Sequence, residues 1–115
     1  MRIRSVSLAL LLFGAAACAS VAHSGTADQN QPTVVVVDNQ SYLDMNVYAV
    51  RSGQRIRLGT ANGVGKTSLT IPSTLVSGVT PIRFVADPIG GTRASVSQEI
   101  TVSPGDTVVM QIPPT

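Results

Sequence analysis

Few side chains of this chain are suited to covalent chemistry, and two of them lie near its start. Cys18 is the only cysteine and His23 the only histidine among the 115 residues. A thiol can serve as a nucleophile, a metal ligand or a point of lipid attachment, but catalysis and metal binding need further groups held in fixed geometry. No such partners surround either residue in the sequence. Cys18 also has no second cysteine with which to form an internal disulfide.

Carboxylates are the remaining candidates for acid–base chemistry. Paired carboxylates can hydrolyse glycosidic bonds without a histidine, so a carboxylate-based hydrolase is one hypothesis to keep. The aspartates, however, stand beside turn residues, where aspartate commonly caps backbone groups. The sequence therefore favours a protein that is not an enzyme, and it predicts neither a cofactor nor a metal site. The carboxylates in question are Asp38, Asp44, Asp87, Glu99 and Asp106.

The segment "GVGKTS" ends like a phosphate-binding loop at Gly65-Lys66-Thr67. That motif needs another glycine five residues before Gly65, where this chain has Thr60. It also precedes a helix, whereas "SLTIP" follows here and alternates like a strand. The pattern indicates a glycine-rich loop between strands.

Three arginines lie on or beside one predicted hairpin, at Arg51, Arg55 and Arg57. They form a candidate basic patch for an anionic ligand, and a solvated sheet face is the alternative interpretation. Nucleic acid is not an expected partner, because loss of Arg2 and Arg4 with an N-terminal signal would leave six basic and six acidic side chains. The predicted domain also lacks tryptophan and has three aromatic side chains, too few for a platform that stacks sugars or bases.

The N-terminus has the three parts of a secretory signal. Arg2 and Arg4 are followed by an apolar run over residues 6–13 and by small residues at 14–17. The apolar run is too short to cross a bilayer, which needs about 20 apolar residues. We therefore expect residues 1–17 to be a signal peptide that takes no part in the fold.

Ala15-Ala16-Ala17-Cys18, directly after this run, resembles the lipobox of bacterial lipoproteins. In that family the cysteine thiol receives a diacylglycerol and cleavage occurs just before it. The resemblance implies a lipid anchor on Cys18, and Ala19 after the cysteine implies sorting to the outer membrane. Residues 18–32, small and polar, then read as a flexible tether.

Ordinary secretion is the alternative. Ala17-x-Ala19 and Ser20-x-Ala22 also satisfy the small-residue rule for a signal peptidase. The family prefers leucine where Ala15 stands, which leaves this route open. The protein would then be a free periplasmic or secreted domain.

Short apolar runs separated by turn residues predict an all-β domain over residues 33–113. We expect about seven short antiparallel strands in a two-sheet sandwich of immunoglobulin-like or transthyretin-like type, with a small closed barrel as the alternative. A helix of more than one turn is not expected, and a single turn fits "STLVSG". The predicted strands cover residues 33–39, 45–51, 55–61, 67–72, 81–87, 95–102 and 107–113.

Alternation of apolar and polar residues assigns faces to several of these strands. Ile56 and Leu58 are expected to point inward, with Arg55 and Arg57 outward. The run from Val34 to Val37 does not alternate, which fits either a strand covered on both faces or an edge strand that pairs with another chain.

These observations lead to a functional expectation. The chain resembles short bacterial envelope lipoproteins that carry one small β-sandwich on a tether, which implies a non-enzymatic binding or structural module at the membrane. Its partner would be an envelope protein or an anionic envelope polymer, reached through loops or a sheet edge. The alternative is a secreted subunit that assembles through an open edge at residues 33–39.

Overall fold

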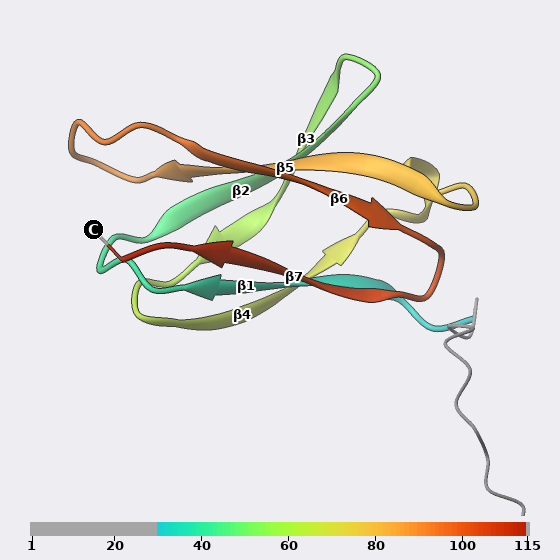
Figure 1. Cartoon of the computed structure of the whole chain (residues 1–115), viewed down its shortest axis with the longest axis horizontal. Coiled ribbons are helices and arrows are strands. Elements are labelled where there is room, and N and C mark those ends of the chain that lie inside the picture. Colours follow the sequence, from blue (N-terminus) through green and yellow to red (C-terminus); the bar gives the residue numbers. More distant parts are fainter. Residues whose placement is uncertain (1–29, 115) are drawn as a thin grey trace, which may run out of the picture.

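The computed structural model describes residues 30–114. They form seven strands and one short 3₁₀ turn, which confirms the predicted all-β sandwich of two sheets (Figure 1). The single turn lies within "STLVSG", as predicted. The elements are β1 (Thr33–Asn39), β2 (Met45–Arg51), β3 (Gln54–Ala61), β4 (Gly65–Ile71), η1 (Ser73–Leu75), β5 (Thr80–Pro88), β6 (Val96–Val102) and β7 (Thr107–Ile112).

The strands divide into a three-stranded sheet with the order β4-β1-β7 and a four-stranded sheet with the order β3-β2-β5-β6. Neighbouring strands are antiparallel except for β1 and β7, which are parallel, a departure from the antiparallel pairing expected throughout. Chain direction explains it. Each connection reverses the chain, so that β1 and β7, both odd in the order, run the same way.

Thr33–Asn39 lies in the middle of its sheet, and the prediction of an open edge there is wrong. Strand β4 pairs with one side of β1 and strand β7 with the other. The residues alternate between buried and half-buried, so the outer face of β1 is not covered either. A run of valines indicates whether the two faces of a strand are buried. It does not indicate whether the strand lies at the edge of a sheet, because that depends on which other strands pair with it.

The core lies between the two sheets and is built by period-two alternation. Phe84 and Met45 are the largest fully buried side chains. Val35, Ile82 and Met110 are 0% exposed and come from three different strands. Full burial of each large apolar side chain contributes about 1.5–3 kcal/mol, so this interface is what holds the domain together in place of a disulfide.

The β2–β3 hairpin turns through Ser52 and Gly53, whose φ angles are 50° and 79°. Two central residues with positive φ define the turn type that matches strand twist in two-residue hairpins. Figure 1 shows this hairpin projecting from the body of the sandwich.

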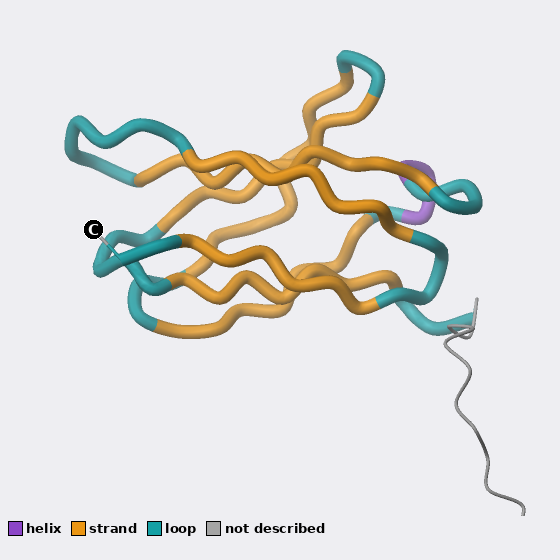
Figure 2. Tube along the Cα trace, viewed as in Figure 1, coloured by secondary structure: helices purple, strands orange, loops and turns teal. Residues whose placement is uncertain are grey.

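The two ends of the sandwich differ in what they carry. The chain enters β1 at one end, beside the β6–β7 turn and the connection that contains η1 (Figure 2). The loops at residues 40–44, 62–64 and 89–95, together with the C-terminus, lie at the opposite end, which we call the distal end. Residues 30–114 include no helix of sufficient length and apolar character to cross a bilayer.

Candidate functional site

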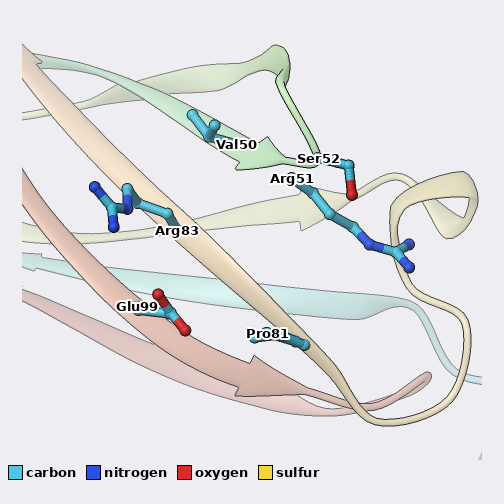
Figure 3. A pocket seen from close by; sticks show the side chains of 6 residues that line it. All are labelled: Val50, Arg51, Ser52, Pro81, Arg83 and Glu99. Atoms are coloured by element: carbon cyan, nitrogen blue, oxygen red, sulfur yellow. The ribbon is translucent and has the colours of Figure 1, made fainter.

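The predicted signal peptide, Cys18 and His23 lie outside the described residues, as does most of the predicted tether. The three arginines of the predicted patch are described, and their side chains take different paths. Arg51, at the end of β2, donates from Nη1 to the carbonyl oxygen of Leu75 at 2.8 Å. Its guanidinium is therefore directed to the β4–β5 connection, as Figure 3 shows, and the patch has Arg55 and Arg57 as its two outward members.

Arg55 stacks on an aromatic ring. Its guanidinium carbon lies 4.0 Å from the centroid of the Tyr48 ring on the adjacent strand. Arg55 is exposed and Tyr48 is half-buried. A cation over an aromatic face at an exposed site contributes about 0.5–1 kcal/mol, so the contact orients the arginine without neutralising its charge.

Arg57 is held by neutral acceptors. Its Nη2 donates to Oδ1 of Asn46 at 3.0 Å and to Oγ1 of Thr60 at 2.8 Å. Thr60 is the register partner of Asn46 and donates to its Oδ1 at 3.2 Å. A register shift between Val47 and Tyr48 places Arg57 on the same face as Thr60, although the two are three residues apart. Both outward arginines are thus oriented by neutral groups and keep their charge available.

Arg83 joins this face, although the sequence did not single it out. Val50 is the register partner of Arg55 on one side and of Arg83 on the other, and Arg83 pairs in turn with Glu99. A shallow hollow of about 440 Å³ lies here, lined by Val50, Arg51, Ser52, Pro81, Arg83 and Glu99 (Figure 3). The sequence predicted a strand over residues 81–87, but that β5 pairs with β2 depends on residues outside both segments.

A second group of residues gathers at the distal end, where Asp44 ties three loops together. Its Oδ1 accepts a hydrogen bond from the backbone N–H of Gly63 at 2.8 Å, and its carbonyl oxygen accepts one from Ile89 at 2.9 Å. The backbone N–H of Val64 donates to the carbonyl of Ser41 at 2.8 Å. The β1–β2, β3–β4 and β5–β6 loops are therefore one hydrogen-bonded assembly.

Asn39, the last residue of β1, makes further hydrogen bonds to these loops. It is 1% exposed, and its Nδ2 donates to the carbonyls of Leu43 and Asn62 at 2.8 and 3.2 Å. Its Oδ1 accepts from the backbone N–H of Ser41 at 3.0 Å. The buried amide thus has hydrogen-bond partners for both its oxygen and its nitrogen.

The same loops carry exposed apolar side chains. Among residues 30–114, five large hydrophobic side chains are exposed, and three of these lie at the distal end. Tyr42 is 63% exposed, Val64 74% and Ile89 47%, each on a different loop. Single exposed apolar residues need no explanation, but here three of the five lie on loops that are hydrogen-bonded to one another at one end of the sandwich. We call Tyr42, Val64 and Ile89 the distal triad.

Val64 also has an unusual backbone, with φ of 51°. Left-handed conformations are costly for β-branched residues, by about 1–2 kcal/mol. Backbone strain of this kind is found most often at functional sites. The sequence predicted this feature only in part. The glycine-rich segment around Val64 indicated a loop between strands, but not which residue would take the left-handed conformation.

The carboxylates that could have formed a catalytic pair act on nearby backbone and hydroxyl groups. Asp106 accepts from the backbone N–H of Ser103 at 2.8 Å, and Asp87 accepts from Oγ of Ser95 at 3.0 Å. Asp106 and Asp44 therefore cap backbone N–H groups, as expected, whereas the partner of Asp87 is a side-chain hydroxyl. Across residues 30–114, no three His, Cys, Asp or Glu side chains are grouped so as to hold a metal ion.

The lysine of "GVGKTS" lies within strand β4. Lys66 is the register partner of Asp38, and Gly65 is the first residue of the strand. A strand rather than a helix follows the glycines, as predicted, so the helix end that would cradle a phosphate does not form here.

Comparisons with protein-family models, with curated proteins and with solved structures gave no match.

Proposed function

We propose that this chain is a lipid-anchored, non-enzymatic binding module of the bacterial cell envelope that recognises a protein partner through the distal triad. The single observation that carries the proposal is the arrangement of Tyr42, Val64 and Ile89 on loops fixed to one another by Asp44. Loops that are ordered before binding lose less conformational entropy when a partner docks. Apolar side chains on an ordered scaffold therefore favour recognition of a protein surface.

The expected lipid anchor is compatible with a distal triad that faces away from the membrane. Eleven residues lie between Cys18 and Asn30, and the twelve Cα–Cα steps from one to the other span at most about 43 Å. An acylated Cys18 would hold the membrane on the side where the chain enters β1, and the distal triad would face away from it. The anchor, export and outer-membrane location remain proposals that rest on the lipobox-like segment and on Ala19.

An anionic envelope polymer is the less favoured partner. Arg55 and Arg57 could meet it, but Glu99 and Asp87 lie on the outer face of the same sheet. A long polyanion that crosses this face would meet carboxylates as well as guanidiniums, which weakens the electrostatic attraction.

Photo-crosslinking in the native cells tests the partner surface. A photoreactive amino acid placed at Tyr42 or Val64 is expected to give a discrete adduct of one size. Val79 is the matched control, because it is 76% exposed and lies in the connection at the opposite end of the sandwich. Equal crosslinking from Val79, or none from the distal positions, would contradict the proposal.

Intact-mass measurement with N-terminal peptide mapping tests the anchor separately. Acyl chains on Cys18 are expected, with the mature chain beginning at that residue. An unmodified N-terminus that follows Ala19 or Ala22 would remove the anchor from the proposal and leave a free exported binding domain.

A further inference from the structure

On the outer face of the four-stranded sheet, charged side chains are arranged so that the faces of two copies can attract each other. The register places Arg55, Val50, Arg83 and Glu99 in one row across the strands β3, β2, β5 and β6. The row thus begins with a cation on one outer strand and ends with a carboxylate on the other. The β3 side is cationic again in the next row, at Arg57.

We infer that this face binds a second copy of the same chain about a two-fold axis parallel to the strands. Rotation about such an axis places β3 over strand β6 of the second copy, and β2 over its β5. Arg55 then faces the partner subunit's Glu99, and the contact occurs twice because the interface is isologous. Rotation about the axis perpendicular to the strands would instead place β3 over β3 and bring like charges together.

Glu99 gains most from this arrangement. It is exposed, and its cross-strand neighbour is Arg83. In the pair of copies the carboxylate lies between Arg83 of its own chain and the partner subunit's Arg55. A carboxylate between two guanidiniums forms charge-assisted hydrogen bonds, which are about twice as strong as neutral ones.

Apolar side chains occupy part of the middle of the face, next to Arg83. Tyr48, Val50 and Val85 occupy the two central strands and are all half-buried. Tyr48 and Val85 are register partners, so the same rotation places the Tyr48 ring opposite the partner subunit's Val85. Apolar contacts at the centre of an interface favour association, and the charged Arg83 and Asp87 lie beside them on the same central strand, β5.

The size of the face sets the expected strength. Four strands at about 4.8 Å spacing and six residues at about 3.4 Å rise give a flat area of about 400 Å² on each copy. Stable interfaces bury about 800 Å² per partner, which is about twice this flat area. We therefore expect reversible association of micromolar or weaker affinity.

Sedimentation of the exported protein carrying Cys18→Ser tests this inference, since the substitution removes both the acyl anchor and the free thiol. Over about 1 µM to about 1 mM, the protein is expected to shift from monomer to dimer. Arg55→Glu and Glu99→Arg should each weaken the dimer at least tenfold, because two attractive contacts become repulsive. The double variant should restore dimerisation by exchanging the charges.

Lys66→Glu is the matched control, because it makes the same charge change on an exposed position of the other sheet and should leave the dimer unchanged. A chain that stays monomeric at 1 mM, a dimer that survives both single reversals, or failure of the double variant to restore it would overturn the inference. If Arg55→Glu fails to fold, the test rests on Glu99→Arg, with the dissociation constant of the dimer measured at several salt concentrations. Binding of a polyanion that Glu99→Arg strengthens, without a dimer, would instead identify an anion-binding face.

This inference concerns a different surface from the distal triad. A protein that stays monomeric but still crosslinks from Tyr42 would overturn the dimer and support the proposed function. A protein that dimerises but gives no crosslink from Tyr42 would support the dimer and overturn the proposed function.

Discussion

The Asp44 carboxylate accepts a 2.8 Å hydrogen bond from the backbone N–H of Gly63, which lies 19 residues further along the chain. The bond joins the β1–β2 loop to the β3–β4 loop, and the carbonyl of Asp44 joins both to the β5–β6 loop. Asp44 therefore contacts all three of the loops that carry the distal triad. The order of this end comes from hydrogen bonds, while the order of the sheets comes from the buried core.

Asp44→Ala is expected to lower the free energy of unfolding by about 1–1.5 kcal/mol, because it removes a charge-assisted but solvent-exposed hydrogen bond. In a domain of this size that corresponds to a fall in Tm of about 4–12 °C. Thermal unfolding followed by circular dichroism measures it. Asp44→Asn keeps the Oδ1 acceptor and should lose less than half as much; equal losses would show that the bond to Gly63 is not the cause.

Gly63→Ala is expected to be severely destabilising. A Cβ at this position would lie 2.4 Å from the carbonyl oxygen of Tyr42, a backbone atom that cannot move without shifting the loop. Gly65→Ala is the matched control two residues away, where the nearest atom would be 3.9 Å from the added Cβ. We expect Gly63→Ala to cost about 2 kcal/mol or more and Gly65→Ala less than about 1 kcal/mol. Similar urea midpoints for the two variants would disprove the close approach.

Local patterning was sufficient to predict the strands, because each strand buries every second residue against one core. Val108, Met110 and Ile112 illustrate this, since all three face inward and the last two are fully buried, while Thr107, Val109 and Gln111 between them are exposed. Pairing was harder to predict. The position of β1 between β4 and β7 depends on residues far away in the chain, and the valine run contains no information about them.

The candidate site was predicted only in part for the same reason. Arg55 and Arg57 alternate with apolar residues and were correctly placed on an outer face. Arg51 falls at the hairpin end, where its partner is a backbone carbonyl 24 residues later in the chain. The distal triad combines residues from three loops, and no local window of sequence contains them together.

Val64→Asn is expected to stabilise the domain while weakening the proposed recognition. Val64 holds φ of 51°, a conformation that asparagine adopts at lower cost, so the substitution should raise the free energy of unfolding by about 1 kcal/mol. It also removes the most exposed member of the distal triad. The paired readouts are Tm and the yield of the Tyr42 crosslink. A rise in Tm with undiminished crosslinking would show that Val64 does not contact the partner.

Arg55→Gln combined with Arg57→Gln separates the two surfaces. The arginines lie on the outer face of β3, whereas Tyr42, Val64 and Ile89 lie on the distal loops. We therefore expect the double variant to lose self-association and to keep the Tyr42 crosslink at its original yield. The domain itself should lose about 1–2 kcal/mol, from the stacking of Arg55 on Tyr48 and the bonds of Arg57 to Asn46 and Thr60. If the crosslink disappears while the domain stays folded, the partner spans both surfaces, and the arginines would have to be counted as part of the recognition site.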